Sequence, residues 1–289
     1  MAGVGPRRRL WLRIAFYGTT LLIVLPFTLS GLIVGTQRLP PGELQAGFEP
    51  VPLRSEGLRL RAWLTRGEAA RPAALLVHGL GDSLESYTDL ARALRRRGHT
   101  VLLVDLRGHG GSEGRYMTLG AREREDVRAG LEHLRRSGLA PAGSFVMGWS
   151  LGAVAALRAA AEREDVRAVI VEAPFDSGRE TIALHARLLF GIPRWLPLLP
   201  LCIRIAEWRA GFRIADADAV AAARALRAPL LAIADGEDRR MPEAVVRRVW
   251  DAHPGPKRLW VAAGVDHVGA VLRPDYWTTV VGFLEEHGL

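Results

Sequence analysis

The chain has 289 residues, a net charge of +8 and an apolar fraction of 49%. That length allows one large α/β domain or two small ones, and the apolar fraction excludes an intrinsically disordered chain. The positive charge is almost entirely arginine spread along the chain, with no basic stripe interleaved with aromatic residues, so we expect no nucleic-acid partner. Cys202 is the single cysteine, which excludes an intrachain disulfide.

An apolar segment near the N-terminus has the length of a membrane span. Residues 10–34 contain Arg13 as their only charge, and three arginines precede them. The segment suits a hydrocarbon core of about 30 Å, whereas the apolar region of a cleaved signal peptide is normally about 7–15 residues long. Signal cleavage and a buried soluble helix are the alternatives. We expect a basic tail at 1–9, a retained signal anchor at 10–35 and a linker at 36–50.

The charge around this segment predicts its orientation. A basic flank should stay in the cytoplasm, so the N-terminus should be cytoplasmic and the chain after about Thr36 should be extracytoplasmic. The protein would then be a single-pass protein of the cell membrane. The sequence Pro40-Pro41-Gly42 in the linker is typical of a short, stiff tether between membrane and domain.

Residues 51–289 alternate between strand and helix patterns, as expected for one α/β domain. Apolar residues alternate with polar ones over 58–64, which predicts a half-buried strand. Continuous apolar runs predict buried strands at 73–77, 100–104 and 168–172, and further apolar runs predict strands at 145–147 and 230–234. Another strand is predicted at 258–261. Helical patterns cover 86–97, 120–137, 153–162, 243–250 and 276–286. The alternation indicates a mostly parallel sheet with helices on both faces.

The alternation breaks between residues 174 and 228. Two strongly apolar helical stretches, 181–190 and 196–208, occur there. We interpret an insertion at about 176–215 as a helical cap over the ligand site, because ligands bind at the carboxyl ends of strands in open α/β sheets. A helix pair packed on the core, or a second membrane-contacting surface, would give the same pattern.

Ser150 is the candidate nucleophile. It lies in Gly148-Trp149-Ser150-Leu151-Gly152, between a predicted strand and a predicted helix. A serine at such a sharp turn takes a strained backbone, so its neighbours must lack side chains that collide. The helix N-terminus that follows also favours developing negative charge.

A nucleophilic serine needs a base and an acid that orients the base. After Ser150 the histidines are His185, His253, His267 and His287. His267 is the candidate base because it lies in a glycine-flanked loop after the last predicted strand. Asp238 is the candidate acid, since it follows the strand at 230–234 and precedes a helix. Asp235, Glu237 and Asp176 remain alternatives, and Asp266 is expected to face water.

Two backbone N–H groups should hold the oxyanion. One belongs to Leu151, the residue after the nucleophile, and the other to Leu80, in the loop that follows the buried strand at 73–77. His78 precedes the serine in the chain, so we expect it to make structural hydrogen bonds within its loop.

Taken together, these motifs resemble the α/β-hydrolase fold superfamily, and most closely its serine aminopeptidase and monoacylglycerol-lipase-like branch with membrane-anchored members. The resemblance covers about 51–289 and is carried by His78-Gly79-Leu80-Gly81, Asp105-Leu106-Arg107-Gly108-His109-Gly110-Gly111-Ser112, the pentapeptide around Ser150, Asp238-Arg239-Arg240-Met241-Pro242 and Gly264-Val265-Asp266-His267. It implies a Ser150, Asp238, His267 triad and an oxyanion hole from Leu80 and Leu151. One departure is Asp235, which stands where a glycine is usual three residues before the acid.

The resemblance implies an anchored serine hydrolase that cleaves an ester, thioester or amide through an acyl-enzyme, without a metal or organic cofactor. An ester of an apolar acyl group is our first expectation, because the predicted cap and anchor place the site near lipid. A serine aminopeptidase is the alternative, with Glu180 or Glu207 pairing with the substrate ammonium. A thioesterase and a non-catalytic anchored binding protein are further alternatives, although the complete set of catalytic residues disfavours the last.

Overall fold

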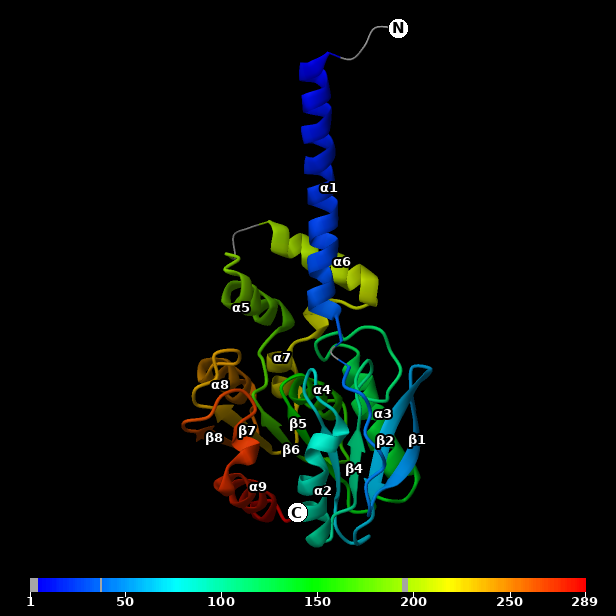
Figure 1. Ribbon diagram of the computed structural model, residues 1–289. Coiled ribbons are helices and arrows are strands. Elements are labelled where there is room, and N and C mark those ends of the chain that lie inside the picture. Colours follow the sequence, from blue (N-terminus) through cyan, green and yellow to red (C-terminus); the bar gives the residue numbers. More distant parts are fainter. Residues whose placement is uncertain (1–4, 37, 194–196) are drawn as a thin grey trace.

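The computed structural model describes residues 5–36, 38–193 and 197–289, and its described strands form one eight-stranded sheet (Figure 1). The strand order is β1-β2-β4-β3-β5-β6-β7-β8. β1 pairs with β2 and β2 with β4 in antiparallel fashion, and all other pairs are parallel. The strands are β1 Glu49–Ser55, β2 Leu58–Thr65, β3 Ala73–Val77, β4 Val101–Val104, β5 Ser144–Trp149, β6 Val166–Glu172, β7 Leu230–Asp235 and β8 Lys257–Ala262. The predicted mostly parallel sheet is confirmed.

Helices cover both faces of this sheet. Along β3, Leu75 and Val77 contact the core that includes α3, α4, α7 and α8, whereas Ala74 and Leu76 contact the core that includes α2 and α9. Both sets are fully buried, which explains why the strand reads as a continuous apolar run. The helices are α2 Thr88–Arg96, α3 Glu123–Arg136, α4 Leu151–Ala160, α7 Ala219–Ala225, α8 Glu243–Ala252 and α9 Pro274–Glu286.

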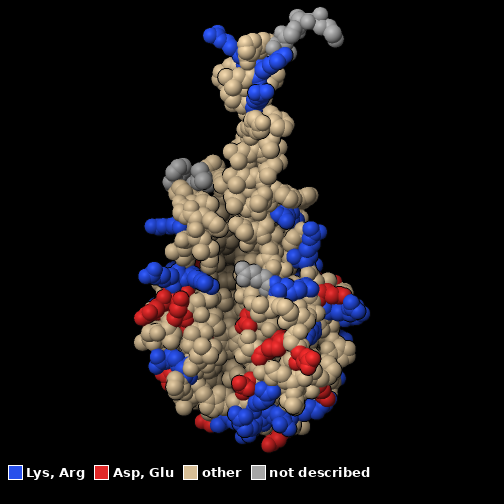
Figure 2. All heavy atoms as spheres, viewed as in Figure 1, with Lys and Arg blue, Asp and Glu red and all other residues tan. Residues whose placement is uncertain are grey.

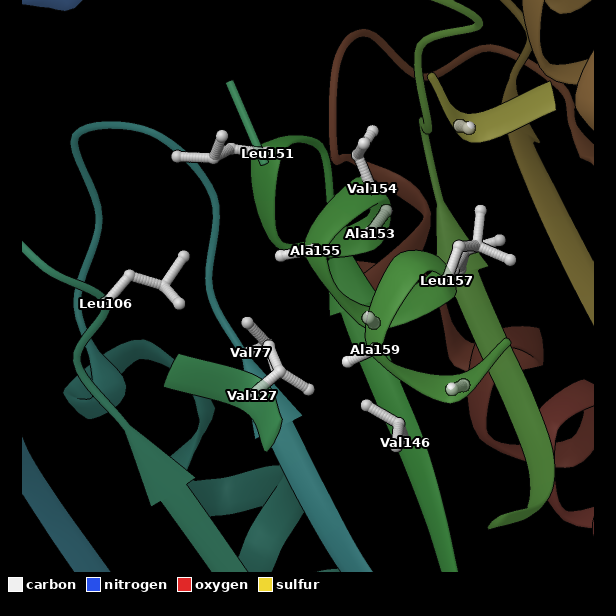
Figure 3. Close-up of a cluster of buried hydrophobic side chains, with 14 of the residues drawn as sticks. Val77, Leu106, Val127, Val146, Leu151, Ala153, Val154, Ala155, Leu157 and Ala159 are labelled. Carbon is white, nitrogen blue, oxygen red and sulfur yellow. The ribbon is translucent and has the colours of Figure 1, made fainter. Parts of the chain in front are cut away.

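α4 is the central helix of one face, and its small side chains let it lie close to the sheet. Figure 3 shows Ala155 and Ala159 on the side of α4 that faces Val77 of β3 and Val146 of β5. All four side chains are completely buried. This packing fixes the helix that begins directly after Ser150, and therefore fixes the position of the serine.

α1, Pro6–Val34, projects from the body as a helix of 29 residues. At 1.5 Å per residue its length is about 44 Å. It is long and apolar enough to cross a membrane, and Figure 2 shows a surface without charged residues between the arginines at its start and the body. The helix begins four residues earlier than the predicted anchor and ends one residue before it.

The last turns of α1 pack on α6, Leu198–Ala210. Arg209 of α6 donates hydrogen bonds from Nη1 to the Phe27 carbonyl oxygen at 2.9 Å and to Ser30 Oγ at 2.8 Å. The linker that follows is not a free tether, since the Gly42 N–H donates to Glu85 Oε1 at 2.7 Å. The helix therefore enters the body with a fixed contact.

α5, Gly178–Phe190, and α6 occupy the region predicted as the cap. Both lie at the end of the molecule from which α1 projects (Figure 1). Residues 194–196 lie outside the described residues; they fall within the predicted cap, and residue 196 is the first of its second predicted helix. Two elements were not predicted: strand β1 and helix α7.

Candidate active site

Ser150 occupies a strained turn between β5 and α4. Its backbone angles are φ +50° and ψ −111°, in the left-handed half of the map where non-glycine residues are rare. The Ser150 N–H donates to the Glu172 carbonyl oxygen at 2.9 Å, which ties the turn to β6. A Cβ on Gly152 would lie 2.2 Å from the Val77 carbonyl oxygen, so the turn can approach β3 only with glycine there.

His267 bridges the serine and a carboxylate. It lies in the loop between β8 and α9, with Nε2 3.0 Å from Ser150 Oγ and Nδ1 2.6 Å from Asp238 Oδ2. With the proton on Nδ1, His267 donates to Asp238 and its Nε2 accepts from the serine hydroxyl. This is the tautomer that can take a proton from Ser150.

Asp238 is held by backbone donors as well as by the histidine. Its side chain is buried, and its Oδ1 accepts from the Arg240 N–H at 2.7 Å and the Met241 N–H at 2.9 Å. Burial raises the pKa of the Asp238 carboxyl, but hydrogen bonds from His267 and Met241 outweigh burial and leave that pKa below its usual value. Asp238 is therefore ionised when it orients His267.

The alternative acids have other partners. Asp235 accepts from the Val268 and Ala270 N–H groups, both at 2.9 Å. Asp176 pairs with Arg248, with 2.7 Å between Oδ2 and Nη2. Glu237 is exposed, as is Asp266. Of the candidate carboxylates, Asp238 is the one that is hydrogen-bonded to the ring of His267.

The other histidines lie in separate environments. His185 contacts the Thr181 carbonyl within α5, and His253 contacts the Ala223 carbonyl at the end of α8. His287 follows the last residue of α9. None of them is hydrogen-bonded to Ser150 among the described residues.

The loop after β3 lies directly against the serine. A Cβ on Gly79 would be 3.3 Å from the Trp149 carbonyl oxygen and 3.4 Å from Ser150 Cβ. Among the hydrogen bonds between described residues, neither the Leu80 N–H nor the Leu151 N–H has an acceptor. His78 behaves as expected of a structural residue, because its Nδ1 contacts the Gly79 carbonyl at 2.7 Å and its Nε2 accepts from the Leu106 N–H at 3.0 Å.

Sequence reasoning missed a buried carboxyl beneath the site. Glu172, the last residue of β6, accepts from Trp149 Nε1 at 2.9 Å. The sequence signal that could have revealed Glu172 is that it is the one charged residue of the apolar run 168–172, with no residue of opposite charge beside it in that run. Across the described residues, no three His, Cys, Asp or Glu side chains lie together as a metal site requires.

Known proteins share this architecture. The family model of the serine aminopeptidase, S33, matches residues 68–201. An uncharacterized protein of Mycobacterium tuberculosis is 34% identical over 228 residues, which are 78% of this chain and 73% of that protein. The chain belongs to the α/β-hydrolase superfamily. The sequence-based assignment to this superfamily is therefore confirmed.

Two further proteins resemble this α/β hydrolase. An sn-1-specific diacylglycerol lipase of Mus musculus is 33% identical over 138 residues, or 45% of this chain and 40% of that protein. An esterase of Pyrococcus furiosus has the same fold with a TM-score of 0.70 and 22% identity, covering 88% of this chain and 99% of that one. The likeness to the solved structure shows that the two chains share a fold.

Proposed function

We propose that this α/β hydrolase is a membrane-anchored serine hydrolase that cleaves a carboxylic ester through an acyl-enzyme. Ser150 Oγ attacks the ester carbonyl carbon while its proton moves to His267 Nε2. The protonated histidine then gives that proton to the departing alcohol. A water molecule, deprotonated by His267, attacks the acyl-serine and releases the carboxylic acid, and the proton returns to Ser150.

The observation that carries this proposal is the continuous hydrogen-bonded chain from Ser150 through His267 to Asp238. Asp238 stabilises the imidazolium that forms when His267 takes the proton. The two N–H groups of Leu80 and Leu151 have no acceptor among the described residues, so they can donate to the oxyanion. Each such donor is typically worth about 2.7–4 kcal/mol of barrier.

The helix α1 supports anchoring to a membrane. About 20 helical residues cross a hydrocarbon core of about 30 Å. Counted from Leu10, such a span ends near Leu29, within the stretch where Phe27 and Ser30 contact Arg209 of α6. α6 would then lie at the membrane boundary, on the side opposite the N-terminal arginines.

The region proposed as the cap carries exposed apolar side chains on α5 and α6, the helices that would lie near the membrane boundary. Leu189 and Phe190 at the end of α5 are 68% and 55% exposed, and Trp208 of α6 is 77% exposed. A water-facing surface rarely collects such groups unless it meets a partner or a lipid phase. They favour a site that receives apolar acyl esters from the membrane. The named activity of the mouse relative, a diacylglycerol lipase, points in the same direction.

The aminopeptidase alternative gains less support from the structure. Glu207, one candidate partner for a substrate ammonium, accepts from the Ile214 N–H at 2.8 Å. It also lines a cavity together with Arg179, Arg204 and Arg213. Three arginines around one carboxylate make a positive environment, which opposes binding of a cation. We therefore place ester hydrolysis ahead of peptide hydrolysis.

Intact-mass analysis of the full chain in detergent after exposure to a fluorophosphonate tests the proposal. We expect one adduct on the parent and none on Ser150→Ala. The other serines of the chain should not react, because a serine hydroxyl without an adjacent base is not nucleophilic enough. A panel of esters with increasing acyl length then defines the substrate. A folded parent without an adduct would refute the serine-hydrolase proposal, and faster turnover of short soluble esters than of long-chain esters would refute the lipid preference.

A further inference from the structure

Two carboxyl groups are buried side by side beneath the proposed active site. Glu172 ends β6 and Asp235 ends β7, the neighbouring parallel strand. Their exposed fractions are 1% and 0%. Both side chains accept hydrogen bonds from the backbone of the same loop, Asp235 from the Val268 and Ala270 N–H groups and Glu172 from the Val271 N–H, so the two carboxyl groups lie close together. Two carboxylates that are both buried on neighbouring strands would repel each other, so we expect one of the two groups to keep its proton.

Asp235 holds the loop that carries His267. Its Oδ2 accepts from the Val268 N–H and its Oδ1 from the Ala270 N–H, both at 2.9 Å. Val268 directly follows the histidine and has a φ of +58°, a strained conformation for a β-branched residue. The two hydrogen bonds from the backbone of this loop to Asp235 therefore hold a strained segment in place.

Glu172 holds the other side of the site. Its Oε2 accepts from Trp149 Nε1 at 2.9 Å, and its Oε1 accepts from the Val271 N–H at 3.3 Å. Trp149 directly precedes Ser150, and the Glu172 carbonyl oxygen accepts from the Ser150 N–H. The pair thus links the turn that carries the nucleophile to the loop that carries the base.

The surroundings keep the proton on the pair. Burial raises the pKa of Glu172 well above its usual range, and the charge of Asp235 raises it further. Burial also raises the pKa of Asp235, although the Ala270 and Val268 N–H groups favour its ionised form. Both backbone donors of Asp235 lie at 2.9 Å, whereas one of the two donors of Glu172 lies at 3.3 Å, so the proton belongs on Glu172. The pair thus carries a single negative charge.

The other ionisable groups around the pair do not compete for this proton. Burial is the main cause that raises the pKa of Asp235, and the negative charge of Asp238, on the loop after β7, raises that pKa further. Tyr87 and Tyr276 face the pair from the segment before α2 and from α9. Burial holds the pKa of both tyrosines well above their usual range, so they stay neutral where Glu172 titrates.

We propose that Glu172 and Asp235 share one proton and act as a positioning pair that keeps His267 within hydrogen-bonding distance of Ser150. This inference rests on the proposed function, since it gives a role only to residues that support the triad.

The pair makes activity sensitive to alkaline pH. When Glu172 loses its proton, two buried carboxylates of like charge repel each other. The pKa of Glu172 is raised in the folded protein, so the stability that its proton provides is present at low pH and is lost as the pH rises through the folded-state value. The loop of His267 should then move, and kcat should fall with little change in KM.

Three single substitutions in the full chain test the pair. Glu172→Gln keeps a donor to Asp235 and an acceptor for Trp149 but cannot ionise, so the alkaline fall in kcat should disappear or move to higher pH. Asp235→Asn puts an NH2 group opposite Val268 or Ala270, so kcat should fall by about tenfold or more while KM stays similar. Glu237→Gln is the control, because Glu237 is exposed on the same loop as Asp235, and its profile should match the parent.

The measurements are kcat and KM for one soluble ester across pH, with circular dichroism to report folding at each pH. A parental pH profile in Glu172→Gln would overturn the inference, and so would an unchanged kcat in folded Asp235→Asn. If Asp235→Asn does not fold, the profile of Glu172→Gln alone decides. Failure of the proposed function would give a different experimental result, because the parent protein itself would then form no fluorophosphonate adduct.

Discussion

Replacing Asp238 by asparagine tests the tautomer of His267, on which the proposed mechanism depends. Asp238 Oδ1 accepts from two backbone N–H groups, so an amide oxygen introduced there should keep that position. The amide NH2 would then take the place of Asp238 Oδ2, which lies 2.6 Å from His267 Nδ1. The NH2 group and the Nδ1–H group are both hydrogen-bond donors, so they could not bond to each other. The proton of the imidazole would have to move from Nδ1 to Nε2. A protonated Nε2 can no longer accept a hydrogen bond from the Ser150 hydroxyl.

The expected loss is large because the wrong tautomer removes the base while leaving its position intact. The corresponding change in a chymotrypsin-like serine protease lowers kcat by about 10⁴, equivalent to about 5.5 kcal/mol of barrier. We expect Asp238→Asn to show a loss of that order in kcat for a soluble ester, an unchanged KM and much slower fluorophosphonate labelling. Asp266→Asn, on the exposed neighbour of the histidine, should match the parent. If Asp238→Asn retained kcat within about tenfold of the parent, the orienting role of Asp238 would be wrong.

Two further predictions concern the close approach at the elbow and the membrane. Gly152→Ala should destabilise the fold by more than about 3 kcal/mol in chemical denaturation, because its Cβ would meet two backbone oxygens at 2.2 and 2.4 Å. Gly282→Ala in α9, whose Cβ would meet only Arg258 Nη1 at 3.9 Å, should instead stabilise by about 0.5–1 kcal/mol, and equal effects would contradict the packing argument. Trp208→Ala should lower hydrolysis of a long-chain ester presented in vesicles but leave hydrolysis of a short soluble ester unchanged. An equal effect on both substrates would count against a membrane-facing α6.

Strands that are buried on both faces were among the elements that the sequence predicted most directly. β3 and β7 are buried on both faces and appear as unbroken apolar runs. β1 escaped prediction because it pairs only with β2 at the edge of the sheet and contains two prolines, which are tolerated at an edge but obscure the strand pattern. α7 was missed because seven residues are too few to show a helical period.

Chain order and motifs alone predicted that Ser150, His267 and Asp238 lie near one another, and in the structure the three are joined by hydrogen bonds. Sequence reasoning favoured Asp238 but left Asp235 open as an alternative, since both follow the same apolar run. The distinction depends on side-chain direction: Asp238 turns toward the imidazole, whereas Asp235 turns toward the backbone of the following loop. The role of Glu172 could not be predicted from the sequence either, because its hydrogen-bond donors, Trp149 and Val271, come from segments far apart in the chain.

The contact between α1 and α6 links the proposed anchor to the proposed cap. A helix that only tethered the domain would need no hydrogen bonds to it, yet Arg209 donates to α1 twice and its guanidinium lies 4.5 Å from the centre of the Phe27 ring. Such contacts fix α6, and with it the exposed Trp208, at one height along α1. An apolar ester that leaves the membrane at that height would meet the cap first, so the depth of α1 in the bilayer should decide which esters reach Ser150.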